Sequence, residues 1–321
     1  MVIKGVFMEY LCVDRGSDRC PCILMEAGQC YTCTMIQKGK CDCTSLWQGV
    51  CPYTEYLQRN KRVMPETKVK KLKIYRVKSY SPTLSVLTLE APLAYGLKCR
   101  EMGAFLMLNW KEWFVPISVL RVVENYESQT SYIDLGVNAT GPKTIGLLKN
   151  AIIGEAIEVK GPFFSGLINR DIFDKRADSI VVAKGMAVMP LLNMKNILEN
   201  PLVENKIWLD GTKLPADFIA EYFDGLNFEE VNLEDGIFDI TESLKEIYGY
   251  GFARGRRPNL LVMTSPYYFS KILKMTGFDK NKIIAPNHSN MCCGEGYCGS
   301  CSYTDIDGIT VRQCKCIDMP L

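Results

Sequence analysis

The stretch SIVVAKGMAVMPLLNMKNILEN, residues 179–200, decides the fold of the central part of this 321-residue chain. It begins with an apolar run of strand length, passes through Gly185, and continues after Pro190 with apolar residues at helical spacing. A buried strand that leads through a glycine turn into a helix is typical of a parallel sheet covered by helices. Ligands bind such sheets at the carboxyl ends of the strands, so the turn at residues 184–190 is a candidate binding region.

The residues that follow continue the alternation of strands and helices. Strands are predicted at residues 205–211 and 258–265, and helices at residues 214–226 and 267–277. We therefore predict an α/β domain with a parallel sheet, similar to nucleotide-binding domains, over residues 171–283.

The residues before this domain have the pattern of short β-strands separated by turn residues. Strands are predicted at residues 73–80, 84–91, 104–110, 114–124, 131–138 and 155–161. One helix, at residues 144–152, interrupts the series. About six strands at this spacing predict a small antiparallel barrel or sandwich, which we assign to residues 66–170.

Near the C-terminus, the segment CGEGYCGSC has the spacing C-x4-C-x2-C, and two more cysteines follow it. This spacing, with one further cysteine at a distance, is the plant-type [2Fe–2S] pattern. A structural zinc site normally has two C-x2-C-like knuckles, and this segment has one. We therefore predict a [2Fe–2S] loop over residues 284–321. The predicted ligands are Cys293, Cys298 and Cys301, with Cys314 or Cys316 as the fourth.

The first 65 residues contain eight cysteines in a repeated pattern. Each repeat has the spacing C-x7-C-x-C-x7-C, and the second begins 21 residues after the first. Eight thiolates without a histidine fit two four-thiolate sites, each able to hold a [4Fe–4S] cluster or zinc. It stays open whether each repeat holds its own metal or exchanges ligands with the other. The predicted ligands of this cysteine-rich module, residues 1–65, are Cys12, Cys20, Cys22, Cys30, Cys33, Cys41, Cys43 and Cys51.

Composition and charge exclude several classes of protein. The chain is 47% hydrophobic and 23% charged with a net charge of +2, which predicts neither nucleic acid nor a membrane as partner. No apolar run reaches the ~20 residues that a membrane-spanning helix needs. The first residues lack the pattern of a signal peptide, so a cytoplasmic location is expected. Thiols stay reduced in the cytoplasm, which favours metal ligation by the N-terminal cysteine repeats. A disulfide framework is the third alternative for these repeats, after [4Fe–4S] clusters and zinc.

The order of barrel, α/β domain and C-terminal CGxGxCxxC motif resembles the electron-transfer subunit of the two-subunit bacterial dihydroorotate dehydrogenase. That family is ferredoxin-reductase-like and carries FAD and a [2Fe–2S] cluster, which the resemblance implies for residues 72–321. The segment NMCCGEGYC, residues 290–298, is similar to the family's segment before and within the cluster loop. The ending CIDMP is similar to the family's ending, which favours Cys316 over Cys314 as the fourth ligand. The first 65 residues lie outside the resemblance.

The resemblance also implies a flavin site on the barrel. The family's Arg-Pro-x-Ser strand is matched by VPIS, in which Val115 replaces the arginine that would meet the FAD pyrophosphate. Restoring that arginine is therefore expected to tighten flavin retention, and Lys143, beside a predicted helix start, is expected to supply the missing charge. The implied FAD-binding residues are Pro116, Ile117, Ser118, Lys143, Thr144, Gly161 and Pro162.

The pyridine-nucleotide motifs of the family are altered in this chain. Its GGxGxAP fingerprint is matched by residues 184–190, in which Lys184 and Ala187 replace two glycines that let the backbone approach a phosphate. The family's later CGP is matched by Thr264-Ser265-Pro266, while Asp235-Gly236 retains part of a third motif. NAD(P) binding is therefore doubtful, although a phosphate contact by Lys184 stays open.

Together these observations predict a flavo-iron–sulfur electron-transfer protein or subunit. It would relay electrons between its clusters and FAD, to or from a partner oxidoreductase subunit that itself could contain flavin. Because electron input from NAD(P)H looks compromised, we favour two [4Fe–4S] clusters over zinc in the N-terminal repeats and consider ferredoxin as a donor. No catalytic residue is assigned. The alternatives are a self-sufficient NAD(P)H-dependent reductase and a non-enzymatic interaction subunit braced by zinc.

Overall fold

The structure is a computed structural model that describes residues 10–41, 51–253, 257–304, 308–316 and 318, with the side chains of residues 250–253 left out of the description. The chain forms two compact units. Residues 68–288 form the larger unit, and residues 1–67 fold together with residues 289–321 into what we call the cysteine unit. The two cysteine-rich ends, which the sequence analysis treats as separate modules, therefore belong to one unit.

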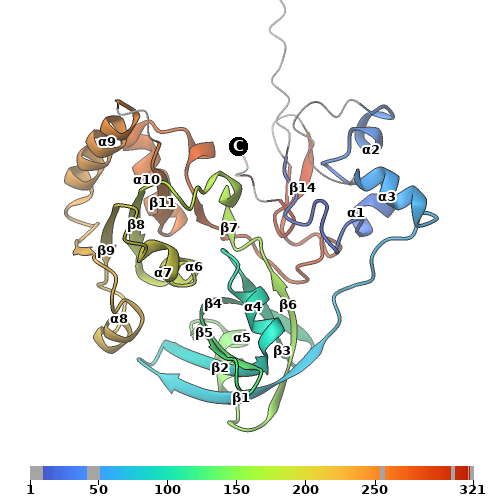
Figure 1. Cartoon of the computed structure of the whole chain (residues 1–321), viewed down its shortest axis with the longest axis horizontal. Helices are drawn as coiled ribbons and strands as arrows, with labels where there is room; N and C mark the ends of the chain where they lie inside the picture. The colour runs from blue at the N-terminus through green and yellow to red at the C-terminus, as the bar shows by residue number, and fades with distance from the viewer. Residues whose placement is uncertain (1–9, 42–50, 254–256, 305–307, 317, 319–321) are drawn as a thin grey trace, which may run out of the picture. The chain divides into compact units, whose positions relative to one another are not determined.

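A closed barrel of six antiparallel strands forms the first half of the larger unit (Figure 1), in the order β1-β2-β5-β4-β3-β6. The strands are β1 (Lys70–Ser79), β2 (Leu84–Pro92), β3 (Phe105–Trp110), β4 (Trp113–Asn125), β5 (Thr130–Asn138) and β6 (Ala156–Phe163). Two helices accompany them, α4 (Leu93–Cys99) and α5 (Pro142–Lys149). The antiparallel barrel predicted from the sequence is confirmed.

A parallel sheet with helices on its faces forms the second half of the larger unit. Its strand order is β10-β9-β8-β11, with β8 (Ser179–Lys184), β9 (Asn205–Asp210), β10 (Glu229–Glu230) and β11 (Asn259–Met263). The helices are α6 (Met189–Leu192), α7 (Lys195–Leu198), α8 (Ala216–Tyr222), α9 (Ile237–Ala253) and α10 (Pro266–Thr276). The predicted parallel α/β domain is confirmed.

The helix predicted after Pro190 is broken into the two short helices α6 and α7. Asn193 lies between them and donates hydrogen bonds from its side-chain amide to the carbonyl oxygens of Cys99 (3.2 Å) and Glu101 (2.9 Å). A polar side chain that bonds a backbone outside its own helix competes with regular helix formation. The break thus ties the α/β domain to the end of α4 in the barrel.

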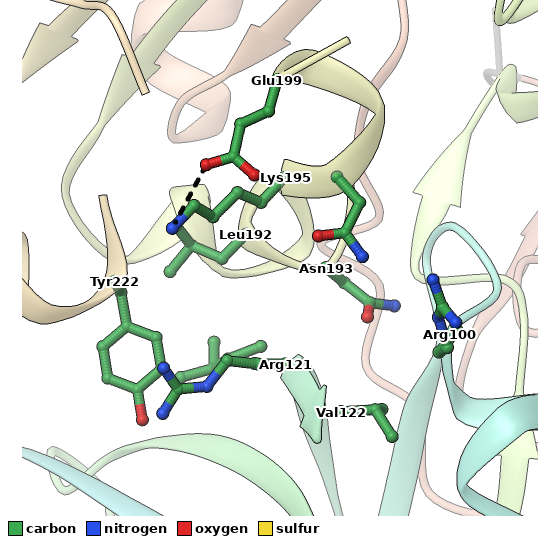
Figure 2. Close-up of a pocket in the computed structure, with 10 residues that line it drawn as sticks. Arg100, Arg121, Val122, Leu192, Asn193, Lys195, Glu199 and Tyr222 are labelled. Atoms are coloured by element: carbon green, nitrogen blue, oxygen red, sulfur yellow. Dashed lines mark ion pairs between the residues drawn. The ribbon is translucent and has the colours of Figure 1, made fainter. Parts of the chain in front are cut away.

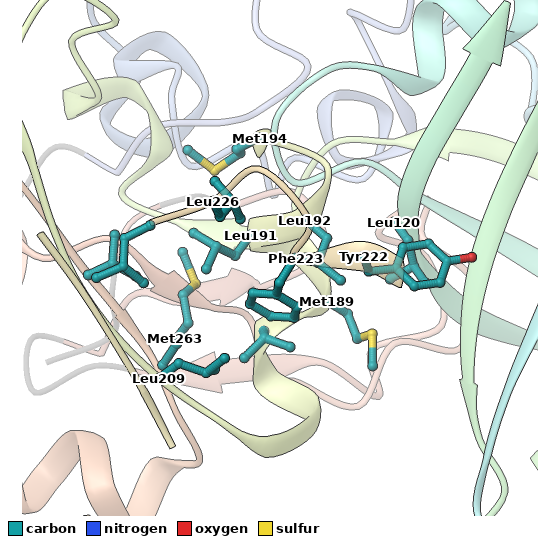
Figure 3. Close-up of a cluster of buried hydrophobic side chains, with 14 of the residues drawn as sticks. Leu120, Met189, Leu191, Leu192, Met194, Leu209, Tyr222, Phe223, Leu226 and Met263 are labelled. Carbon is teal, nitrogen blue, oxygen red and sulfur yellow. The ribbon is translucent and has the colours of Figure 1, made fainter. Parts of the chain in front are cut away.

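Barrel and sheet share one hydrophobic core, which Figure 3 shows around Leu120, Met189 and Tyr222. Strand β2 explains how this is possible, because its side chains alternate between two buried faces. Leu87 and Leu89 belong to the interior of the barrel, whereas Leu84 and Val86 pack with the α/β domain. A Cβ added to Gly136 would stand 2.7 Å from the Met189 sulfur, so this glycine permits the close approach.

A buried carboxylate reinforces the same boundary. Asp134 on β5 accepts hydrogen bonds from Thr88 (2.6 Å), from Arg121 (2.7 Å) and from the hydroxyl of Tyr222 in α8 (3.0 Å). The Arg121 guanidinium also lies 4.7 Å from the Tyr222 ring. The charge of Asp134 is therefore compensated by groups from both domains.

Replacing Asp134 with asparagine is expected to lower the free energy of unfolding by about 2 kcal/mol, because hydrogen bonds to a charged group become bonds to a neutral one. Urea denaturation followed by circular dichroism measures the change. Tyr222→Phe is the smaller comparison, since it removes one hydrogen bond and is expected to cost about 1 kcal/mol. If the free energy of unfolding of the Asp134→Asn variant equals that of the wild type, the charge of Asp134 adds nothing to stability through these hydrogen bonds.

The cysteine unit has little regular structure. It contains α1 (Ile23–Glu26), α2 (Thr34–Lys38), α3 (Pro52–Gln58), β13 (Ser302–Thr304) and β14 (Thr310–Arg312). Its two sequence segments meet at an antiparallel bridge between Cys12 and Cys316, where the Val13 amide donates to the Lys315 carbonyl at 2.7 Å. Throughout the described part of the chain, helices lack the length and apolarity that crossing a membrane requires.

Candidate functional site

The C-terminal loop curls because three of its glycines adopt a left-handed backbone. Gly294, Gly296 and Gly299 have φ angles of +69°, +89° and +75°, which other residues rarely adopt. The space around Gly296 is also restricted, since an added Cβ would lie 3.3 Å from the Lys315 side chain. These glycines bring the cysteines of residues 293–301 to one side of the loop.

Four thiols meet in this loop. The Cys314 thiol lies within hydrogen-bonding reach of both Cys293 and Cys301, and Cys298 also contacts Cys293. Backbone amides point at the same sulfurs, from Glu295 to Cys293 at 3.3 Å and from Cys314 to Cys301 at 3.4 Å. The thiol hydrogen bond from Cys314, together with these amides, lowers the pKa of Cys293 to about 4 and that of Cys301 to about 7.

Cys316, which the sequence favours as fourth ligand, is directed elsewhere. It packs with Cys12 and Cys22 in the small core of the cysteine unit, while Cys314 joins the loop. The cause is a tight turn in which the Arg312 carbonyl accepts from the amides of both Lys315 and Cys316 at 2.8 Å. This turn sends the two cysteines in different directions although one residue separates them. In the structure Cys314, rather than Cys316, lies beside Cys293 and Cys301, and the choice of the fourth ligand stays a prediction.

The four cysteines of the first repeat line one narrow pocket of ≈ 20 Å³: Cys12, Cys20, Cys22 and Cys30. Burial raises the pKa of three of these thiols, that of Cys20 to about 11. A positive charge at the pocket would favour their thiolate forms.

The second repeat is only partly described, because Cys43 lies outside the described residues. Cys33 is buried, Cys51 is half-buried and Cys41 is exposed. Burial raises the pKa of Cys33, and the neighbouring Cys30 and Cys51 add to the effect. Among the residues that the structure describes, no group of three or more Cys, His, Asp or Glu side chains has the arrangement of a single metal-ion site. None of the cysteines in the described part of the chain is joined to another by a disulfide bond.

On the barrel, the residues implied for flavin binding lie on the two strands β4 and β6, which flank β3, and on the helix α5. Pro116 is exposed and Ser118 half-exposed on β4, whereas Ile117 points into the core. Across the sheet, Phe105 of β3 pairs with Ser118 on one side and with Phe163 on the other, beside Gly161-Pro162 of β6. Gly161 and Pro162 are buried, unlike Pro116, and one strand separates them from Ser118.

The start of α5 holds the other two implied flavin residues. The Thr144 hydroxyl accepts from the Gly141 amide at 3.3 Å and donates to the Gly141 carbonyl at 3.1 Å, so it caps the helix. The Lys143 ammonium group lies 4.2 Å from the ring of Trp113, which is 48% exposed at the start of β4. A cation and an exposed aromatic ring therefore flank this helix N-terminus.

Val115 does not occupy a surface position that lacks an arginine. It is 5% exposed and belongs to the hydrophobic core of the barrel, opposite Leu108 of β3. An arginine here would be buried among apolar side chains. The burial of Val115 therefore argues against the prediction that an arginine here would tighten flavin retention.

At the carboxyl end of β8, Lys184 pairs inside the protein. It is 6% exposed and forms a hydrogen-bonded ion pair with Asp210 at the end of β9, and its ammonium group lies 5.0 Å from the Tyr268 ring. Asp210 is fully buried and also accepts from Thr212 (2.6 Å) and from the Leu233 amide (2.8 Å). Burial raises the pKa of Asp210, but the hydrogen bonds from Lys184, Thr212 and Leu233 outweigh it and hold that pKa below its ordinary value.

The charge of Lys184 is thus matched by Asp210 within the protein, while a phosphate contact by Lys184 stays a prediction. The neighbouring motif, Thr264-Ser265-Pro266, makes internal contacts. Thr264 is buried, and its hydroxyl donates to the Ser265 carbonyl at 3.2 Å. The Thr264 carbonyl lies 2.9 Å from a ring nitrogen of His288. Sequence reasoning missed Asp210, although an aspartate that directly follows a predicted strand is a recognisable signal.

A pocket of ≈ 180 Å³ lies between β4 and the α6–α7 segment (Figure 2). Three cations line it, but each has an acidic partner: Arg100 with Glu124 at 2.7 Å, Arg121 with Asp134 at 2.7 Å, and Lys195 with Glu199 at 3.5 Å. The pocket was not predicted from the sequence. Because its charges are matched, we interpret it as part of the boundary between barrel and sheet.

No protein-family model and no curated protein matches this sequence. Among solved structures, the chain is similar to an NADH-dependent reduced ferredoxin-NADP oxidoreductase described in connection with flavin-based electron bifurcation, with 16% identity over 78% of this chain and 87% of that chain and a TM-score of 0.57. It is also similar to phthalate dioxygenase reductase, described as a modular structure for electron transfer from pyridine nucleotides to [2Fe–2S], with 15% identity, coverage of 78% and 95%, and a TM-score of 0.51. At these identities the similarity establishes the fold, a ferredoxin-reductase-like barrel followed by a parallel α/β domain.

Proposed function

We propose that this chain is an electron-transfer protein or subunit that holds a [2Fe–2S] cluster in its C-terminal loop and FAD on its barrel. The observation that carries the proposal is the meeting of Cys293, Cys298, Cys301 and Cys314 in a loop whose backbone amides point at the sulfurs. Four thiolates are the ligand set of such a cluster, and hydrogen bonds to the sulfurs help to set its reduction potential. Cys314 takes the place that sequence similarity gave to Cys316.

The barrel offers surfaces suited to the two ends of FAD. On β4, five residues or ~17 Å of strand separate Trp113, beside Lys143, from Ser118. We assign the pyrophosphate to Lys143 and the N-terminus of α5, where a cation and the helix dipole favour an anion. The flavin ring is assigned to the outer face near Pro116, Ser118 and Gly161-Pro162. When bound, flavin exchanges electrons in pairs or singly.

For the N-terminal repeats we propose iron–sulfur centres, with zinc as the alternative. Support comes from the first repeat, whose four cysteines line one pocket. Electrons would pass between these centres, FAD and a partner oxidoreductase, with a ferredoxin as a candidate donor. Zinc has no redox chemistry, so its presence would favour the interaction-subunit alternative for this end of the chain.

The self-sufficient NAD(P)H-dependent reductase is the second candidate, because the fold is shared with a reductase of pyridine nucleotides. Against it stands the Lys184–Asp210 pair at the carboxyl ends of β8 and β9, where a nucleotide would bind. Internal pairing leaves neither charge available for a nucleotide.

The cluster is tested by electron paramagnetic resonance on anaerobically purified, reduced protein. We expect one S = 1/2 signal typical of [2Fe–2S] in the wild type and in Cys292→Ala, an exposed neighbour that serves as matched control. The signal is expected to disappear in Cys298→Ala and Cys314→Ala and to persist in Cys316→Ala. If it persists in Cys293→Ala, Cys298→Ala, Cys301→Ala and Cys314→Ala alike, the assignment fails.

Flavin is tested by denaturing the same preparation and by mixing it with reductants. About one FAD per chain should be released, and dithionite should reduce the bound flavin within the mixing time. NADH and NADPH should reduce it slowly or not at all, because Lys184 and Asp210 neutralise each other. Rapid stoichiometric reduction by NADH or NADPH would instead support the self-sufficient reductase.

A further inference from the structure

Glu295 is a buried carboxylate in the C-terminal loop, where its side chain is only 9% exposed. Lys315 and Asp14, which are also buried in the cysteine unit, form an ion pair with each other. No such ion pair of Glu295 occurs among the residues that the structure describes, and its carboxylate instead accepts a hydrogen bond from the Thr67 amide at 3.1 Å. Burying a carboxylate without a cation is costly, so this position invites a functional explanation.

The linker between α3 and β1, residues 59–69, belongs to the cysteine unit as far as Thr67. Its Met64 amide donates to the Pro21 carbonyl at 2.8 Å. The Thr67 amide then donates to Glu295 just before β1 begins. The bond to Glu295 thus fixes the linker at the point where the larger unit starts.

The chain passes between the two units twice, after Thr67 and after His288. Glu295 follows shortly after the second crossing, so its bond to Thr67 joins the two crossings within the cysteine unit. A second hydrogen bond runs beside it, from the Tyr297 hydroxyl to the Glu66 carboxylate at 3.2 Å. Both connections between the units are therefore anchored to the same loop.

The residues on either side of the Glu295 carboxylate are held in turn. The Gly296 carbonyl accepts from the Arg312 side chain at 3.2 Å, and the same guanidinium donates to the Gln29 side chain at 3.2 Å. The Glu295 amide donates to the Cys293 sulfur at 3.3 Å. Glu295 therefore joins a predicted cluster ligand, through its amide, to the linker, through its carboxylate.

We propose that Glu295 is a positioning residue that straps the linker to the C-terminal loop, so that the loop and both connections to the larger unit move together. A carboxylate suits this task, because hydrogen bonds to a charged acceptor are about twice as strong as those to a neutral one. The consequence for electron transfer rests on the proposed function. A fixed linker limits the separations that the C-terminal cluster and FAD can take, and reaction between two groups depends on their proximity.

The strap is tested by hydrogen exchange of the Thr67 amide in the full-length, anaerobically purified protein, measured by mass spectrometry of overlapping peptic peptides. Glu295→Met keeps the side-chain volume and removes the acceptor, so the exchange is expected to become about tenfold faster or more. Glu295→Gln keeps an acceptor and should restore most of the protection. Glu26→Met, at an exposed glutamate of α1, is the matched control and should leave the exchange unchanged.

The wild type alone can overturn the proposal, if its Thr67 amide exchanges as fast as an unprotected amide. Equal exchange in wild type and Glu295→Met would also overturn it, as would equal acceleration in Glu295→Met and Glu295→Gln. If Glu295→Met does not fold, the wild-type rate and the Glu295→Gln variant still decide the matter, because the first must show protection and the second must retain most of it.

The positioning role is tested by electron transfer after flash photoreduction of the flavin, in which one electron leaves the reduced flavin and one is taken up by the oxidised [2Fe–2S] cluster. The transfer is expected to be about tenfold slower in Glu295→Met and close to the wild-type rate in Glu295→Gln, at unchanged FAD content and S = 1/2 signal. An unchanged rate in Glu295→Met despite lost Thr67 protection would refute the positioning role. Absence of FAD or of the signal from the wild type would instead refute the proposed function, while the Thr67 exchange still decides whether the strap exists.

Discussion

Replacing Val115 with arginine is expected to lower the free energy of unfolding by about 3–5 kcal/mol, because it puts an unpaired charge into the barrel core. Val115 is 5% exposed and packs with the interior side chains of β3 and β4. Urea denaturation of the flavin-free protein measures the loss. Flavin retention is expected to fall together with the free energy of unfolding. A comparison of sequences alone would predict the opposite, that the arginine tightens flavin retention.

A matched control lies on the same strand. Val123 is 47% exposed on β4, so Val123→Arg is expected to change stability by no more than about 0.5 kcal/mol. If Val115→Arg proved as stable as Val123→Arg and held FAD more tightly, the side chain at position 115 would have to reach the surface of the barrel, contrary to the packing seen for Val115.

Lys184→Met is the second substitution expected to have a large effect. It leaves the Asp210 carboxylate buried without its cation, and the free energy of unfolding should fall by about 3–5 kcal/mol. Asp210→Asn in the same chain should recover most of this loss, since an amide oxygen still accepts from Thr212 or Leu233. Lys206→Met, which breaks an exposed pair with Glu229 on the neighbouring strand, should cost no more than about 1 kcal/mol. Equal losses for the two lysine variants would contradict a special role for the buried pair.

The same pair gives a pH dependence with a definite sign. The pKa of Asp210 is held below its ordinary value in the folded protein, chiefly because hydrogen bonds from Lys184 and Thr212 outweigh the effect of burial. The stabilisation from Asp210 is therefore complete above the ordinary carboxylate pKa and is lost as the pH falls through the depressed value. The difference in free energy of unfolding between wild type and the Lys184→Met/Asp210→Asn double variant should therefore change with pH only in that acidic range.

The barrel and the sheet were predictable because their signals are local. Strands such as residues 84–91 and 179–184 have lengths, turn residues and apolar patterns that a single stretch of sequence reveals. The broken helix after Pro190 was not predictable in the same way, because Asn193 bonds to carbonyl groups almost one hundred residues earlier in the chain. At Asn193 the hydrogen bonds to these distant carbonyl groups override the local propensity for a continuous helix.

The candidate sites show the same limit. Cysteine spacing identifies Cys293, Cys298 and Cys301 as a group, but the choice between Cys314 and Cys316 depends on the turn closed by the Arg312 carbonyl. Val115 matches a family position in the sequence motif, whereas its burial depends on which face of β4 points into the barrel. The pairing of Lys315 with Asp14 joins residues 301 positions apart, a separation over which spacing carries no information.

That separation has a consequence for how the protein is made. Translation produces Asp14, in the first cysteine repeat, 301 residues before Lys315. At a synthesis rate of about 5–20 residues per second, the early thiols wait roughly 15–60 seconds for the residues that enclose them. The cysteine unit is therefore completed only after the larger unit has been synthesised, so a premature stop codon within residues 68–288 would release a chain whose first repeat lacks the segment that packs against it.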